Sequence, residues 1–269
     1  MNDLKFDLHT HHDRCGHAVG TIQDYIEAAI KQGLNVIGIA DHSPYFSCEE
    51  DQPFPRITMA KSEFSIYVNE VLQLREKYKD KIEVLLGVEV DFFPEYVENY
   101  RLHFNNYPFD YIIGSVHHVD GVSIFKKGRW EGLSTQEKIQ TKETYYHLIE
   151  QSAKSGMYQI LGHIDAMKGF YPSFSDIPTQ AVEHTIKVIA ENDIVIEVNT
   201  SGKTKDVGGW YPSNDILELA KYYGVRITFG SDAHHPNRVG DEAVRYHLLH
   251  MGFKDWVYFK QKKRIIVSL

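Results

Sequence analysis

The chain alternates between short apolar runs and longer segments in which apolar residues recur every three or four positions. The short runs are rich in β-branched residues and almost continuously apolar. This pattern is typical of strands that are buried on both faces of a parallel sheet. It predicts strands at Leu4–Leu8, Val36–Ala40, Ile82–Val90, Tyr111–Val116, Tyr158–Leu161, Ile194–Val198 and Val225–Phe229, with a terminal strand in Trp256–Leu269.

The segments between these runs have the periodicity of amphipathic helices. In Thr21–Gln32 the apolar residues share one face, and Gly33 follows as a stop signal. The same pattern predicts helices at Ser62–Lys79, Glu95–Phe104, Glu137–Lys154, Thr179–Glu191, Asn214–Tyr223 and Glu242–Met251. Alternating strands and helices indicate a parallel α/β fold, which we expect to form a single domain over residues 1–269.

Composition narrows the class of protein. Hydrophobic residues make up 42% and charged residues 25% of the 269 positions, which predicts an ordinary globular core. The net charge of −8 disfavours nucleic acid as a partner, but a small phosphate ester can still bind through metal ions. The chain has only two cysteines, its N-terminal segment does not resemble a signal peptide, and it has no long apolar run. These features predict a cytoplasmic protein without a membrane partner.

Each of the first seven predicted strands ends in a histidine or a carboxylate. These residues are Asp7, His9, His11, Asp41, His42, Glu89, Asp91, His117, His163, Asp165, Glu197, Asp232 and His234. A β/α barrel gathers the carboxyl ends of its strands around one axis, whereas an open sheet spreads them along a line. The clustering of reactive residues at these ends therefore favours a barrel.

Spacing within the motifs indicates metal binding. His9 and His11 are two positions apart, so on a strand their side chains point the same way, and Asp232 and His234 repeat this arrangement. Imidazole and carboxylate ligands suit zinc, manganese or iron. One histidine at a strand end is more often a hydrogen-bonded residue than a ligand, but ligand chemistry at all the strand ends predicts a metal site. His17 lies in the loop after His11 and is placed to close over it.

Neighbouring residues receive other roles. His12, His118 and His235 each directly follow a candidate ligand, so on an extended strand they would point to the opposite face, and we assign them no metal. Asp7 and Asp41 are predicted to orient histidines through hydrogen bonds.

The order of these motifs resembles the PHP superfamily, the polymerase and histidinol phosphatase enzymes. The matching elements run in order across almost the whole chain: His9 and His11, then His17, Asp41-His42, Glu89 in GVEVD, His117 in GSVH, His163, and Asp232 with His234 in SDAH. The segments DHSP, GVEVDFFPE, FDYIIGSVHHVDG and GSDAHHPNRVG are similar to the histidinol-phosphate phosphatase branch. This resemblance implies a distorted (β/α)7 TIM-like barrel that holds three divalent metal ions, which are zinc, manganese or iron.

The resemblance also implies three ligand sets, each short of a full coordination shell. Open positions of this kind are what a catalytic metal site needs for water or phosphate oxygens. The sets are His9, His11, Glu89 and Asp232 for one metal, Glu89, His117 and His163 for a second, and His17, His42 and His234 for a third.

The function expected from the resemblance is the hydrolysis of L-histidinol phosphate, in histidine biosynthesis, by hydroxide generated at the metals. The partner would be a small phosphorylated amino alcohol. Glu89, Asp232 and His234 are expected to act in catalysis as well as metal binding; Asp232, water or a histidine would protonate the leaving oxygen. Weaker expectations place the phosphate against Arg238 and Lys168 and a substrate hydroxyl or amine against Asn199.

Three alternatives remain at this level. Another PHP phosphoesterase would act on a nucleotide, a nucleic acid or phosphotyrosine, but a nuclease should have a basic track near the ligands, and none is evident. An amidohydrolase-like enzyme would share the first histidine pair, yet Glu89 and the SDAH motif fit the PHP pattern better. A purely structural metal site is disfavoured because such sites are closed and often rich in cysteine. The oligomeric state is not predicted.

Overall fold

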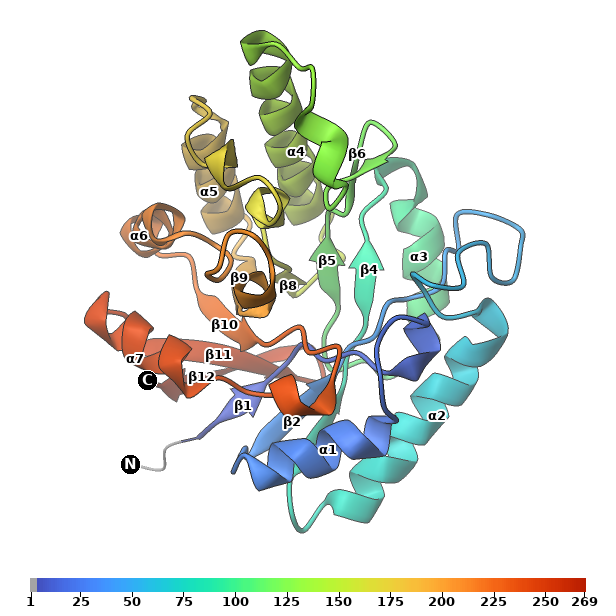
Figure 1. The fold of residues 1–269 in the computed structure, drawn as a ribbon. Coiled ribbons are helices and arrows are strands. Elements are labelled where there is room, and N and C mark those ends of the chain that lie inside the picture. Colours follow the sequence, from blue (N-terminus) through green and yellow to red (C-terminus); the bar gives the residue numbers. More distant parts are fainter. Residues whose placement is uncertain (1–3) are drawn as a thin grey trace.

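A computed structural model describes residues 4–269, in which helices surround a central group of parallel strands (Figure 1). Residues 1–3, part of the segment compared above with a signal peptide, lie outside the described residues. The helices are α1 (Ile22–Lys31), α2 (Lys61–Tyr78), α3 (Val97–Phe104), α4 (Thr135–Lys154), α5 (Ala181–Glu191), α6 (Asn214–Tyr223) and α7 (Glu242–His250). Between residues 4 and 269, no helix has both the length and the apolarity to cross a membrane.

The parallel strands form two sheets. One has the order β1-β2-β3 and the other the order β10-β9-β8-β5-β4. The strands are β1 (Phe6–Asp7), β2 (Val36–Ile39), β3 (Glu83–Leu86), β4 (Glu89–Asp91), β5 (Ile113–Ser115), β8 (Ile160–Leu161), β9 (Val195–Asn199) and β10 (Ile227–Gly230). The predicted parallel α/β fold is therefore confirmed.

Backbone contacts connect the two sheets on both sides. After β1, the Leu8 amide donates to the Phe229 carbonyl of β10 at 3.1 Å, and Thr10 bridges to Ala233 in parallel. After β2, His42 forms a parallel bridge with Glu89 of β4. These contacts bring the carboxyl ends of the strands in both sheets side by side.

The predicted strand Ile82–Val90 is divided into β3 and β4 at Gly87. A Cβ atom at Gly87 would lie 2.4 Å from the ring of Tyr111, and one at Gly38 would lie 1.8 Å from the Tyr111 hydroxyl oxygen. The same hydroxyl donates to the Leu8 carbonyl at 2.5 Å. The two glycines thus make room for a buried tyrosine that links three strands, which the apolar pattern alone does not reveal.

A terminal strand is present as predicted, but residues 256–269 do not form a single strand. This segment forms an antiparallel hairpin of β11 (Asp255–Lys260) and β12 (Lys263–Ser268). Gln261 and Lys262 join the strands with φ angles of 52° and 60°, as a two-residue hairpin turn requires. A second hairpin, of β6 (His118–Val119) and β7 (Val122–Ser123), was also not predicted.

Capping residues fix where helices begin. Ser134 and Glu137 form a reciprocal capping box, so α4 begins at Thr135, two residues before the predicted start. Thr21 and Asp24 form the same box at α1. Each box satisfies two amide donors that would otherwise have no partner.

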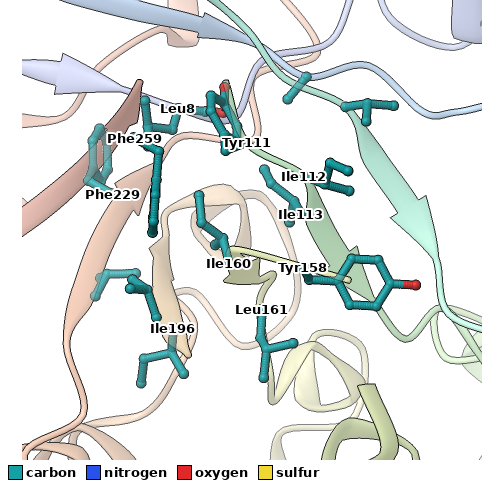
Figure 2. Packing of buried hydrophobic residues seen from close by; sticks show 14 of the residues in the cluster. Leu8, Tyr111, Ile112, Ile113, Tyr158, Ile160, Leu161, Ile196, Phe229 and Phe259 are labelled. Carbon is teal, nitrogen blue, oxygen red and sulfur yellow. The ribbon is translucent and has the colours of Figure 1, made fainter. Parts of the chain in front are cut away.

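The core lies between the strands and the helices. Figure 2 shows how apolar side chains from several strands gather in one cluster, among them Leu8, Ile113, Ile160, Ile196 and Phe229. All of these are at most 2% exposed, and burial of one such side chain stabilises the fold by roughly 1.5–3 kcal/mol. This packing gives the strand ends a rigid base.

Candidate metal centre

The nine residues predicted as metal ligands come together at the carboxyl ends of the strands, with Glu89 at their centre. Glu89 is 1% exposed and begins β4. One of its oxygens, Oε2, lies 3.4 Å from His9 Nε2, 3.6 Å from His11 Nε2 and 2.8 Å from His42 Nδ1. Three imidazoles from two other strand ends therefore face one carboxylate oxygen.

The other oxygen of Glu89 faces a different pair of histidines. Oε1 lies 3.0 Å from His163 Nε2 and 3.4 Å from His117 Nε2, and it accepts a hydrogen bond from the Ser115 hydroxyl at 2.7 Å. Glu89 thus stands between two groups of imidazoles, as expected for a carboxylate shared by two metals.

Asp232 and His234 complete the cluster from the segment after β10. Asp232 Oδ1 lies 3.0 Å from His11 Nε2. His234 Nε2 lies 2.9 Å from His17 Nε2, and its ring stacks on His11 with centroids 4.1 Å apart. The loop that carries His17 therefore folds back over the strand ends, as predicted.

The cluster fits divalent cations because several buried polar atoms in it have no hydrogen-bond partner. These atoms are His9 Nε2, His11 Nε2 and Glu89 Oε2. Buried polar atoms are almost always paired, since leaving one unpaired costs free energy. Among the described residues, four sets place their ligand atoms within 4.8 Å of one another, namely His11 with His42 and His234, His9 with His11 and Asp232, His42 with Glu89 and His117, and His11 with Cys15 and Asp41.

Electrostatics prepare three members of the cluster, His17, His234 and Glu89, for cation binding. Burial lowers the pKa of His17 to about 4 and that of His234 to about 3, and neighbouring histidines add to this shift, so both imidazoles are neutral near pH 7. Burial alone would raise the pKa of Glu89, but His42, His9 and other histidines outweigh it and hold the pKa well below its usual value. Neutral imidazoles and ionised carboxylates are the forms that bind metal.

Carboxylates behind the cluster fix the orientation of the imidazoles. Asp41 accepts from His11 Nδ1 at 3.0 Å, as predicted. Asp91 pairs with His117 Nδ1, a role that we did not predict for it. Asp7 instead accepts from backbone amides, including that of His9 at 3.2 Å, and contacts no imidazole in the described residues.

A cavity of about 720 Å³ opens onto the cluster, and cationic side chains line its walls. Arg238 is among them, as predicted. Arg56, Lys203 and Lys205 also line the cavity; Lys203 pairs with Asp241, whereas Arg56 and Lys205 have no ion pair with a carboxylate among residues 4–269. The signal that would have identified Lys205 is its position in the loop after β9, on the side of the strand ends.

Lys168 and Asn199, both predicted to contact substrate, do not line the cavity, and their contacts with substrate stay predictions. Lys168 is 3% exposed, its ammonium is 2.7 Å from Asp165, and it does not line the cavity. Asn199 is fully buried and donates to Asp232 at 3.3 Å, so it contacts a candidate ligand. Both side chains have partners within the protein, and this leaves neither available at the cavity wall.

Histidines next to the ligands differ in position. His12 is buried with Nε2 3.3 Å from Asp41, and His235 accepts from the Asn237 amide at 3.3 Å. His118, expected to point away, lines the cavity. The reason is local, because His118 begins the β6–β7 hairpin and does not continue the direction of β5.

Comparison with known proteins gives the family. The model of the PHP domain matches residues 7–201, which is most of the chain and includes seven of the nine candidate ligands. The chain belongs to the PHP family. Two candidate ligands, Asp232 and His234, lie beyond the matched segment. The fold brings them next to His11 and His17 of that segment.

Relatives of this PHP chain match it over nearly their full lengths. A protein of Deinococcus radiodurans named "Probable histidinol-phosphatase" is 32% identical over 87% of this chain and 88% of its own length. The histidinol-phosphatase of Bacillus subtilis is 30% identical over 88% of this chain and 96% of its own.

A solved structure shares the fold. Histidinol phosphate phosphatase from Lactococcus lactis, complexed with zinc, L-histidinol and phosphate, superposes with a TM-score of 0.77. The match covers 97% of this chain and 98% of that one at 20% sequence identity. At this identity the likeness shows the fold alone.

Proposed function

We propose that this PHP chain is a metal-dependent phosphomonoesterase that hydrolyses L-histidinol phosphate to L-histidinol and phosphate. The observation that carries the proposal is the cluster in which unpaired nitrogens of His9 and His11 face an unpaired oxygen of Glu89, a residue that lines the cavity. Relatives at 30% and 32% identity are named for this activity. A cavity of about 720 Å³ suits a small phosphorylated amino alcohol, since small-molecule sites usually measure roughly 300–1,000 Å³.

The proposed centre holds three divalent ions, which are zinc, manganese or iron. The two oxygens of Glu89 divide the imidazoles into the groups that the first two ligand sets need. The pair of His17 and His234, together with His42, supports the third set. Bound divalent ions would neutralise charge on the phosphoryl oxygens and make hydroxide available near neutral pH.

The chain's own residues orient the reacting groups. Asp232 is 11% exposed toward the cavity; its Oδ1 faces His11, and its Oδ2 accepts from Asn199. Held in this way, Asp232 is placed to accept a proton from the attacking water. Glu89 and His234 would hold metal ions next to the phosphate.

Phosphate contacts are proposed for the cations that line the cavity and have no carboxylate partner in the described part of the chain. Arg238 is the predicted one, and Arg56 and Lys205 join it because of their position. A guanidinium can bind two phosphate oxygens at once, whereas an ammonium acts as a point charge. Lys205 also lies 5.6 Å from the centre of the Phe125 ring, which fixes it near His117 and His163.

Three broader features are proposed with the function. The links from β1 to β10 and from β2 to β4 support a distorted (β/α)7 barrel. Strands from both ends of the sequence contribute residues to one site, and this supports a single domain. Two free thiols support a cytoplasmic location, and the expectation that nucleic acid is not a partner stays a prediction.

The decisive experiment measures phosphate release from L-histidinol phosphate by protein of known metal content, beside nucleotides, phosphotyrosine and single-stranded DNA. We expect selective turnover of histidinol phosphate, lost on chelation by about 10³-fold or more and restored by added metal, because metal stabilisation contributes several kcal/mol. In the same assay Arg238→Ala should raise KM more than it lowers kcat. Turnover of a different ester would keep the metal centre and refute the substrate.

A further inference from the structure

Glu197 is a buried carboxylate of β9 that the proposed ligand sets do not include. It is 1% exposed, and its side chain accepts three hydrogen bonds. Oε1 accepts from His9 Nδ1 at 2.6 Å. Oε2 accepts from the His163 backbone amide at 3.0 Å and from Asn199 Nδ2 at 2.9 Å.

These three donors connect Glu197 to residues of different proposed metals. His9 and His163 belong to separate ligand sets, and Asn199 also donates to Asp232 Oδ2 at 3.3 Å. The orientation of the Asn199 amide is fixed, because its Oδ1 accepts from the Ser201 amide at 2.9 Å and from the Ser201 hydroxyl at 2.8 Å. One carboxylate therefore contacts ligands on both sides of Glu89.

Two of these ligands have backbone conformations that need support. His163 has a φ of 23° and Asp232 a φ of 54°, which are positive values that residues other than glycine rarely adopt. Such conformations persist only where surrounding contacts hold them. Glu197 holds His163 through its amide and Asp232 through Asn199.

The space for Glu197 is made by a glycine at the end of β10. A Cβ atom at Gly230 would lie 2.0 Å from Glu197 Oε1 and 2.5 Å from His9 Cβ. The glycine that precedes Ser231-Asp232 thus has a physical explanation, since it lets the Glu197 carboxylate reach His9.

We propose that Glu197 is the positioning residue of the metal centre, which keeps the His9 proton on Nδ1 and so presents a bare Nε2 to the metal. The proposal rests on the metal centre of the proposed function and not on its substrate. An ionised carboxylate only accepts hydrogen bonds, so the His9 nitrogen that faces it must be the donor. His9 Nε2, on the side of Glu89 and Asp232, is then the nitrogen left to bind the metal.

Glu197→Gln tests this directly, because a glutamine has the same shape but only one accepting oxygen. Its NH2 group must face either His9 Nδ1 or the two donors from His163 and Asn199. The first choice moves the His9 proton to Nε2, which blocks the metal. The second places donors against donors and displaces His163.

The readout is Zn²⁺ affinity of the metal-free protein, measured by competition with a chromophoric chelator, together with bound zinc per chain. We expect Glu197→Gln to bind zinc about 10- to 100-fold more weakly, the usual effect of losing a carboxylate behind a ligating histidine. Nitrogen NMR of the zinc-bound protein should show His9 as an Nδ1-protonated imidazole in the wild type and should lose that signal in Glu197→Gln, a change that a loss of stability alone would not produce.

The matched control is Asp110→Asn, another buried carboxylate that accepts from two backbone amides but from no imidazole. It should keep wild-type zinc affinity. Glu197→Asp, which keeps the charge but retracts the acceptors, should give an intermediate loss and serves if the glutamine variant does not fold. Wild-type affinity in both Glu197 variants, or an equal loss in the control, would overturn the proposal. Zinc binding with no turnover of histidinol phosphate would instead refute only the proposed substrate.

Discussion

Glu89 and Asp110 are both buried carboxylates with 1% exposure, yet their surroundings differ in kind. Asp110, on the amino side of β5, accepts from the Leu86 amide at 2.8 Å and the Gln261 amide at 2.9 Å, and it pairs with Arg75. Glu89 directs an oxygen without a hydrogen-bond partner toward several imidazoles. A carboxylate whose acceptors are all satisfied stabilises a fold, whereas one left open among imidazoles is arranged for a cation.

The largest effect should come from Glu89→Gln, which removes the charge that both groups of histidines face. We expect kcat to fall by at least about 10²-fold, because a shared ligand and several kcal/mol of charge stabilisation are lost. Metal content per chain should fall with it. Steady-state turnover and elemental analysis measure the two effects. Full activity at normal metal content would contradict the metal-binding role that distinguishes Glu89 from Asp110.

Asp110→Asn should do the reverse, changing stability and leaving turnover unaltered. An asparagine can accept from one of the two amides but places its NH2 group against the other, and Arg75 loses its partner. We expect a loss of about 2 kcal/mol in the free energy of unfolding, the scale of a hydrogen bond to a charged group. Urea unfolding of the metal-free protein measures it. An unchanged midpoint would show that Asp110 does not have the structural role assigned to it.

A smaller effect concerns the protonation of two imidazoles near Glu89, those of His11 and His117. Burial alone would lower the pKa of His11 and His117, but the nearby carboxylates of Asp232, Asp41, Asp91 and Glu89 outweigh it and raise both pKa values to about 9 in the metal-free protein. Both imidazoles are therefore protonated at pH 7 and must lose a proton to bind metal, so zinc affinity should rise between pH 7 and pH 9.

Calorimetry in two buffers of different ionisation enthalpy measures this proton release. The observed binding heat should depend on the buffer more strongly at pH 7 than above pH 9, where most of the His11 and His117 imidazoles are neutral. Asp110→Asn should give the same release as wild type. A buffer-independent heat at pH 7 would contradict the raised pKa values.

The sequence by itself determined much of the fold and the list of candidate ligands. Near-continuous apolar runs specify buried parallel strands, because both faces of such strands meet helices or the core. His9 and His11 were predicted as ligands from their spacing of two positions on a strand, and the other ligands were predicted from their positions at the ends of the other strands. Where the pattern failed, as at residues 256–269, a polar two-residue turn divided an apolar stretch that sequence periodicity treats as one.

Tertiary structure decided which polar residues face the metals and which face each other. Lys168 and Asn199 occupy suitable positions in the sequence, but Asp165 and Asp232 lie within reach and take their hydrogen-bonding groups. Glu197 ends a strand like the other candidates, yet its partners come from residues 34 and 188 positions away. Such contacts depend on register between strands and on the space left by Gly230, which no local pattern encodes.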